Sequence, residues 1–399
     1  MKHPWLFLVS LAIVAQASGS DWPQWRGPNR NGVSAETIST NWPAGGPNVL
    51  WRANIGTGFS SISIARGRAY AMGNTTNEDT IWCFDARSGR EIWRHSYPSL
   101  LGPQYYEGEP ASTPTVESNR VFTIGKWGDV FCLDAASGKV IWQRDLRHDG
   151  LTPNRWGFAG SPLLWGNLVF LNAGAAGTAL DRETGKIVWS NGTNAAGYAS
   201  PVMMNANGRE TLLIFAARHM IGLEPRTGRE LWRQFWETGW DTNNSDPLVH
   251  QNRILISSFS RGCALLSLHD DVPEVIYDNK NLRSHLSPGI VQGDYLYAFN
   301  GEAKQDTDFR CIHVPTGEIK WTTKDPAFGS VIGAAGKLIL LSDKGELVVA
   351  DVSPQGFTTL ARAKVLSVLC WTPPSLATGL LYVRNAKGEL LCLDLQGAR

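Results

Sequence analysis

The stretch that decides the fold is Asp134-Ala135-Ala136-Ser137-Gly138-Lys139-Val140-Ile141-Trp142. An acidic residue stands first, a Ser-Gly pair follows, and a Trp comes eight residues after the acid. The same spacing recurs along the chain at Asp85/Gly89/Trp93, Asp181/Gly185/Trp189, Glu224/Gly228/Trp232 and His313/Gly317/Trp321, the last two with a substituted first residue. Degraded copies begin at His269 and Asp351, and an eighth begins at Asp394.

The interval between copies runs from 38 residues (His313 to Asp351) to 49 residues (Asp85 to Asp134). That period is typical of a propeller blade of four antiparallel strands. In the second copy, alternation and turn residues predict strands at residues 112–116, 120–125, 129–134 and 139–144. The Gly lies where a tight turn needs positive φ, and the Asp side chain can accept hydrogen bonds from the turn amides.

Ring closure is predicted from the two ends of the chain. The last copy, residues 373–396, supplies three strands, and the chain ends before any Gly-x3-Trp. Residues 49–53, with Trp51 in the middle, have the pattern of a fourth strand without a blade before them. Pairing the two segments would remove both open edges. The sequence therefore predicts an all-β, eight-bladed β-propeller closed by the N-terminal strand near Trp51, with seven blades as the alternative if a degraded copy is an elaboration.

The repeated Trp residues are predicted to be structural. Each points into the gap between blades, where burying an indole contributes at most about 5 kcal/mol. The residues with this docking role are Trp51, Trp93, Trp142, Trp189, Trp232 and Trp321.

The N-terminus reads as a secretory signal over residues 1–19, with an apolar run at residues 6–15 and two alternative small-residue cleavage sites. An uncleaved anchor is the alternative. No Cys lies near the cleavage site, so a lipid anchor is not expected. The expected organisation is a signal peptide (1–19), an extension (20–48) and the propeller (49–396), in a periplasmic or secreted protein without a transmembrane segment.

The net charge and the positions of the cysteines argue against a nucleic-acid-binding protein and against a disulfide-bonded one. The net charge of the 399-residue chain is +1, so nothing global attracts nucleic acid. Four Cys (Cys83, Cys132, Cys311 and Cys392) occupy one position of the repeat, and neighbouring blades hold such positions too far apart for a disulfide, so we expect buried thiols. Whether Cys263 and Cys370 pair is left open.

The repeats resemble a known family. Tandem Asp-x-x-Thr/Ser-Gly-Lys/Arg-x-x-Trp phrases, with Ser-Pro steps at Ser161, Ser200 and Ser287, resemble the PQQ-type tryptophan-docking repeat over roughly residues 48–396. This repeat is shared by quinoprotein alcohol dehydrogenases and by the non-catalytic BamB-like propeller of outer-membrane β-barrel assembly. The stretch that runs from Asp21 to Pro28 also resembles the lead-in of exported PQQ-binding-like propellers. The resemblance implies eight blades and leaves the cofactor open.

The hypothesis that the protein is an enzyme is the less favoured one. The resemblance would then imply a PQQ/Ca²⁺-dependent dehydrogenase of alcohols or sugars, with an Asp base and oxygen ligands for Ca²⁺. Adjacent Cys residues and a Cys-x-x-Cys-His motif are absent from the sequence. Acids do occur in the predicted loops (Glu107, Glu109, Asp241, Asp246, Glu302, Asp306 and Asp308), where such side chains are usually solvated. We therefore assign no catalytic residue, no metal ligand and no cofactor.

The favoured reading is a non-catalytic scaffold, monomeric, that binds a protein or a small anionic or sugar ligand at one end of the ring. Long loops and second-to-third-strand turns open on that end, and Arg and aromatic residues concentrate binding energy. For each Arg or aromatic residue taken alone, the alternative to ligand binding is that the aromatic ring packs a loop against the ring of blades or that the charged group is solvated. The ligand-binding candidates are Trp127, Arg155, Trp156, Arg218, His219, Trp240, Asp241, Arg261 and His285.

Overall fold

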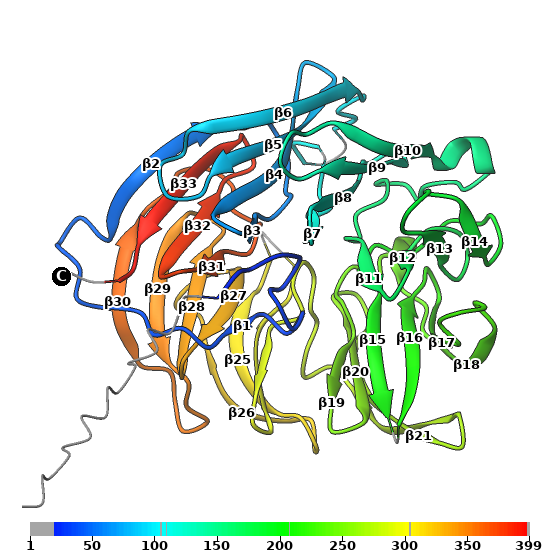
Figure 1. Cartoon of the computed structure of the whole chain (residues 1–399). Helices are drawn as coiled ribbons and strands as arrows, with labels where there is room; N and C mark the ends of the chain where they lie inside the picture. The colour runs from blue at the N-terminus through cyan, green and yellow to red at the C-terminus, as the bar shows by residue number, and fades with distance from the viewer. Residues whose placement is uncertain (1–19, 104–105, 109, 207, 303–304, 397–399) are drawn as a thin grey trace, which may run out of the picture.

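The computed structural model describes residues 20–103, 106–108, 110–206, 208–302 and 305–396, so the predicted signal peptide and Glu109 lie outside the described residues. Eight antiparallel sheets follow one another around a ring (Figure 1). Seven blades have the predicted sequential order of four strands, and the two degraded copies at His269 and Asp351 each form a complete blade. The eight-bladed prediction is confirmed, and the seven-bladed alternative is wrong.

The first four blades have the following strands: β3 (Ser63–Ala65), β4 (Arg68–Thr75), β5 (Glu78–Asp85) and β6 (Glu91–Pro98); β7 (Thr115–Glu117), β8 (Arg120–Ile124), β9 (Asp129–Asp134) and β10 (Val140–Asp145); β11 (Leu163–Trp165), β12 (Leu168–Leu171), β13 (Thr178–Asp181) and β14 (Ile187–Ser190); β15 (Val202–Ala206), β16 (Arg209–Phe215), β17 (His219–Leu223) and β18 (Glu230–Phe235). Two short 3₁₀ turns, η1 (Leu146–Asp149) and η2 (Gly239–Asp241), lie in the loops after β10 and β18.

The remaining blades are β19 (Leu248–His250), β20 (Arg253–Ser258), β21 (Gly262–His269) and β22 (Val272–Asn279); β23 (Ile290–Gln292), β24 (Tyr295–Asn300), β25 (Asp308–His313) and β26 (Glu318–Thr323); β27 (Gly329–Ala334), β28 (Lys337–Ser342), β29 (Glu346–Asp351) and β30 (Thr359–Lys364); β31 (Ser375–Ala377), β32 (Leu380–Arg384) and β33 (Glu389–Asp394) with β2 (Asn48–Asn54). A two-residue strand, β1 (Val33–Ser34), pairs in parallel with β27 and adds a fifth strand to the seventh blade.

Closure follows the prediction: β2 pairs antiparallel with β33, with Val49 opposite Leu393 and Asn54 opposite Glu389. Figure 1 shows blue β2 beside red β33, the two ends of the chain in one sheet. Trp51 on β2 then docks on the first blade, where its Nε1 donates a 2.9 Å hydrogen bond to the carbonyl of Ala86. The first and last blades are thereby joined by the same contact as their neighbours.

The docking contact is repeated around the ring. At four further blade boundaries the docking Trp lies against the third-to-fourth-strand turn of the next blade, and its Nε1 donates to a carbonyl there: Trp93 to Ala135, Trp142 to Arg182, Trp189 to Pro225 and Trp321 to Ser353, at 2.9–3.0 Å. Trp232 is the exception, because its buried Nε1 finds no acceptor among the described residues. Trp321 is only partly buried, whereas the other five are at most 8% exposed. In the fifth blade Tyr277 takes the place of Trp and donates through its hydroxyl to the carbonyl of Val314.

All six Cys are buried free thiols, which confirms the expectation for the four repeat positions and leaves Cys263 and Cys370 unpaired. Among the described residues, no helix has the length and apolar character needed to cross a membrane.

Candidate binding pocket at the mouth of the ring

Residues 21–34, the axial segment, bond to the inner ends of many blades. Trp22 forms a two-way backbone bridge with Ile64 of the first blade, at 2.8 Å in each direction. The carbonyl of Pro23 accepts from Val116 N of the second blade, and Arg30 Nη1 donates to the carbonyl of Pro162 at the third. Arg26 Nη2 donates to the carbonyl of Gly289 at the sixth. Segments that are far apart in sequence can meet in this way only where the blades converge, so the axial segment fills the central channel.

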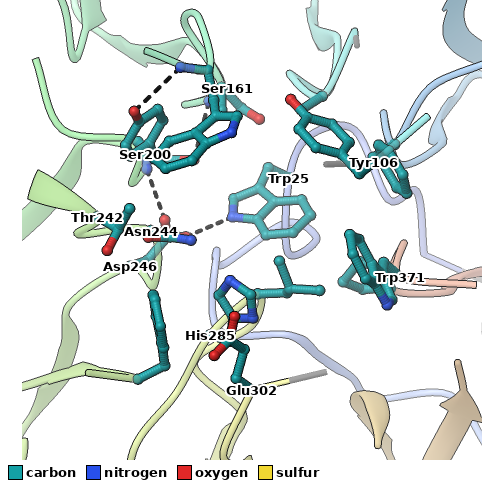
Figure 2. A pocket seen from close by; sticks show the side chains of 18 of the residues that line it. Trp25, Tyr106, Ser161, Ser200, Thr242, Asn244, Asp246, His285, Glu302 and Trp371 are labelled. Atoms are coloured by element: carbon teal, nitrogen blue, oxygen red, sulfur yellow. Dashed lines mark hydrogen bonds between the residues drawn. The ribbon is translucent and has the colours of Figure 1, made fainter. Parts of the chain in front are cut away.

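Above this segment lies a cavity of about 670 Å³. The loops between blades line it, together with one turn each of the fifth and sixth blades. Its aromatic lining consists of Trp25, Phe59, Tyr106, Trp156, Tyr198, Trp240, Phe259 and Trp371, and its polar lining includes Arg155, Ser161, Ser200, Thr242, Asn244, Asp246, His285 and Glu302. Figure 2 shows Trp25 at the centre, with side chains of the other lining residues around it. The axial segment therefore supplies the floor of the pocket.

Asp246 fixes this floor. Its Oδ2 accepts a 2.5 Å hydrogen bond from Trp25 Nε1, and its Oδ1 accepts a 2.7 Å hydrogen bond from Ser200 N (Figure 2). The carboxyl is buried, and burial raises its pKa, while the guanidinium groups of Arg26 and Arg30 oppose that rise. Burial in turn lowers the pKa of each of these arginines to about 10. The carboxyl group of Asp246 is thus held within the ring by two hydrogen bonds and lies within electrostatic range of two arginines.

The position of Asp246 belongs to a series. At the step that enters a blade, a side-chain oxygen accepts the backbone N–H of the corresponding residue one blade earlier: Ser61 N to Thr113, Thr113 N to Ser161, and Ser161 N to Ser200, at 2.9–3.1 Å. Ser200 N continues the series to Asp246. A hydroxyl oxygen suffices for the series alone, but the carboxylate of Asp246 has a second oxygen for Trp25.

Four of the nine ligand-binding candidates line the pocket. The guanidinium of Arg155 lies 5.3 Å from the ring centroid of Trp156 and 4.8 Å from that of Trp240. Trp240 is 70% exposed at the rim and has φ of 65°, in the left-handed region that a non-glycine residue rarely adopts. His285 packs at 4.5 Å against Phe259, and burial lowers its pKa to about 4, so its ring is neutral at pH 7.

The other five candidates do not line the pocket, although their turns open on the same end. Arg218 pairs with Asp241 at 2.9 Å and with Glu237 at 3.4 Å. Arg261 pairs with Asp278 and stacks 3.6 Å over Trp236. His219 packs against Phe235, and Trp127 donates through Nε1 to the carbonyl of Leu100. Charge pairing and loop packing account for their contacts.

Trp25 and Trp371 line the pocket although neither is predicted as a site residue, and Asp246 is predicted only as one of the loop acids. A signal for Asp246 was present: Asp246-Pro247 stands in the series Ser161-Pro162, Ser200-Pro201 and Ser287-Pro288, with an acid in place of the hydroxyl. Trp25 lies in the quoted lead-in, but nothing local to it predicts that it reaches the axis.

The acids that line the described part of the pocket are engaged in hydrogen bonds. Both oxygens of Asp246 already accept hydrogen bonds, and Glu302 Oε2 accepts from Gln305. In the part of the chain that the structure describes, no group of three or more His, Cys, Asp or Glu side chains is arranged to hold a metal ion.

Comparisons with known proteins agree with the fold. A family model described as outer membrane protein assembly factor BamB matches residues 77–323. The chain is 24% identical to the BamB protein of Yersinia pestis over 343 residues, covering 78% of this chain and 80% of that protein. It is 32% identical to the quinoprotein alcohol dehydrogenase PedH of Pseudomonas putida over 123 residues, which is 29% of this chain and only a fifth (20%) of that enzyme.

Two solved structures are also similar. BamB from Moraxella catarrhalis superposes with a TM-score of 0.65 at 16% identity, covering 88% of this chain and 98% of that one. The quinohemoprotein alcohol dehydrogenase from Comamonas testosteroni gives 0.65 at 14% identity, covering 95% of this chain and 81% of that one. At these identities the likeness shows the fold.

Proposed function

The chain belongs to the family of outer membrane protein assembly factor BamB, and we propose that it is an exported, non-catalytic scaffold that binds its partner at the mouth of the ring. The observation that carries the proposal is the aromatic cavity at one end of the channel, which the loops of successive blades build together. Large pockets lined by aromatic side chains and a few polar groups are the usual binding sites of proteins.

The contacts of the pocket side chains support binding rather than catalysis. The carboxylate of Asp246 would be the natural general base, but it accepts hydrogen bonds from Trp25 and Ser200 and has arginines behind it. A general base must reach the proton that it removes. Asp246 therefore serves to hold the floor.

Photo-crosslinking tests the proposal. A benzoylphenylalanine placed at Trp240, on the rim, should give a crosslinked product in cells that express the protein. The same residue at Val188, which is 49% exposed on the outermost strand of the third blade, should give none. Equal products from both positions, or products from Val188 alone, would contradict binding at the mouth.

A quinoprotein dehydrogenase is the second candidate, and the matches to quinoprotein alcohol dehydrogenases are the observation in its favour. Titration of the purified chain with PQQ and Ca²⁺, followed by an alcohol oxidation assay with an artificial electron acceptor, decides between the two. Oxidation that depends on both additions would establish the enzyme.

Periplasmic or secreted localisation, as a monomer, is part of the proposal. It is supported by the signal-like sequence of residues 1–19 and by the name of the family. Cell fractionation tests the localisation, and the intact mass of the exported chain tests whether residues 1–19 are removed.

A further inference from the structure

The axial segment makes the pocket blind. Trp25 is fixed to the fifth blade through Asp246, and Arg26 is only 6% exposed beneath it. Below the floor, a second cavity among the residues of the axial segment and the neighbouring blades holds about 10 Å³, too little for a ligand. A long molecule cannot pass through the ring and must enter the pocket by one of its ends.

The charges of the described lining favour a neutral occupant. Asp246 lies within electrostatic range of Arg26 and Arg30, and the described lining holds one further acid, Glu302, and one arginine, Arg155. His285 adds no charge at pH 7. A strongly anionic ligand would meet the acid Glu302, and a strongly cationic ligand would meet the guanidinium of Arg155.

The lining also argues against a purely apolar occupant. Ser200, Thr242, Asn244 and Asp246 lie together on one side of the pocket in Figure 2. Both oxygens of Asp246 are already bonded, but the buried Oδ1 of Asn244 has no hydrogen-bond partner among the described residues. Covering this side with hydrocarbon would leave that oxygen unsatisfied, which is costly. The occupant should therefore combine apolar ring faces, for the aromatic walls, with hydroxyl groups that both donate and accept.

We propose that the pocket takes the end of a neutral saccharide chain, whose pyranose rings pack on the indoles of Trp25, Trp156 and Trp240 while its hydroxyls bond to the polar wall. This inference rests on the proposed function and names the class of its ligand. The cavity of about 670 Å³ lies within the range of roughly 300–1,000 Å³ that is usual for small-molecule pockets. Because the pocket is blind, recognition is of chain ends.

Calorimetric titration of the full chain with linear neutral tetrasaccharides of glucose, xylose and mannose tests the proposal, with β-cyclodextrin as a glucose oligomer without ends. We expect at least one linear tetrasaccharide to bind with a Kd near or below about 1 mM, and β-cyclodextrin to bind at least about tenfold more weakly. Trp156→Ala and Trp240→Ala should each lower the affinity at least about tenfold.

Trp165→Ala is the matched control, because Trp165 ends β11 outside the pocket lining and its Nε1 donates to Glu210. It should leave the affinity unchanged. The proposal is overturned if none of the linear tetrasaccharides binds, if β-cyclodextrin binds as well as they do, or if the pocket variants bind like Trp165→Ala. Crosslinking at the mouth without saccharide binding would leave the proposed function intact and refute only this inference.

Discussion

Gly185 of the third blade lies directly against the indole of Trp142 of the second. A Cβ added to Gly185 would stand 2.5 Å from Cε3 of Trp142, too close for any side chain. The equivalent pairs Gly89/Trp51, Gly138/Trp93 and Gly228/Trp189 have the same relationship, at 2.5–2.6 Å. The Gly and the Trp of the repeat are thus partners across a blade boundary, and the Gly makes room for the Trp as well as shaping its turn.

Gly185→Ala should therefore destabilise the protein by about 2–4 kcal/mol, because a left-handed φ of 69° and a steric clash act together. Gly166→Ala is the control: its φ is 54°, but nothing lies within 4 Å of the added Cβ, so only the backbone cost of about 1–2 kcal/mol remains. Urea unfolding measures both. Equal losses of stability in the two variants would contradict the cost assigned to the clash with Trp142.

Trp142→Phe should cost about 1 kcal/mol more than Trp232→Phe. Trp142 Nε1 donates to the carbonyl of Arg182, whereas Trp232 Nε1 is buried and finds no acceptor among the described residues. The difference arises because the fifth blade connects β21 and β22 through the short turn at Asp270-Asp271 instead of the Gly turn. A larger loss for Trp232→Phe in urea unfolding would contradict this account.

Asp246→Ser restores the hydroxyl used at the other blade steps, but it removes the acceptor of Trp25 Nε1. We expect a loss of about 2–3 kcal/mol, at the upper end of the usual cost of leaving a buried donor without its acceptor. Ser161→Ala, which removes only one acceptor of the series, should cost about 1 kcal/mol. A loss for Asp246→Ser no greater than that for Ser161→Ala would contradict the importance of the hydrogen bond from Trp25.

Arg384→Leu should destabilise the closure of the ring. This fully buried guanidinium donates to the carbonyls of Ser60, Met72 and Gly56 in and before the first blade, and burial lowers its pKa to about 9. Leucine would leave these carbonyls unpaired, at about 1–3 kcal/mol for each one that water cannot reach. Arg52→Leu, at an exposed site on β2, should change stability by less than about 0.5 kcal/mol in the same thermal or urea measurement.

Asp79 predicts a pH dependence. Burial raises its pKa to about 6, against hydrogen bonds from Asn74, Ser99 and Tyr97 that lower it. Since the folded chain holds this proton more tightly than the unfolded chain, the contribution of Asp79 to stability falls as pH rises from about 4 to 6, by up to about 3 kcal/mol. Melting temperatures of wild type and Asp79→Asn should be close below about pH 4 and should separate as the pH rises to about 6, with the variant more stable. Parallel curves would contradict the shifted pKa.

The sequence by itself determined the blades and the Trp contacts that connect neighbouring blades. Alternation, turn residues and the Trp spacing are local and recur in copy after copy, so the strands, the closure by β2 at Trp51 and the docking role of the Trp residues could all be predicted. The reason for the invariant spacing could not, because Gly185 touches a Trp from the preceding copy.

Only the tertiary structure decided the pocket. Its floor combines Trp25 with Asp246, 221 residues away, and its walls come from loops that meet because the ring brings them together. Arg155, Trp156, Trp240 and His285 reach this cavity, whereas Arg218 and Arg261 turn to nearby carboxylates. All six are residue types that fit a binding site. What separates them is the direction of each side chain relative to the axis, which depends on the packing of neighbouring loops and leaves no trace in local sequence pattern.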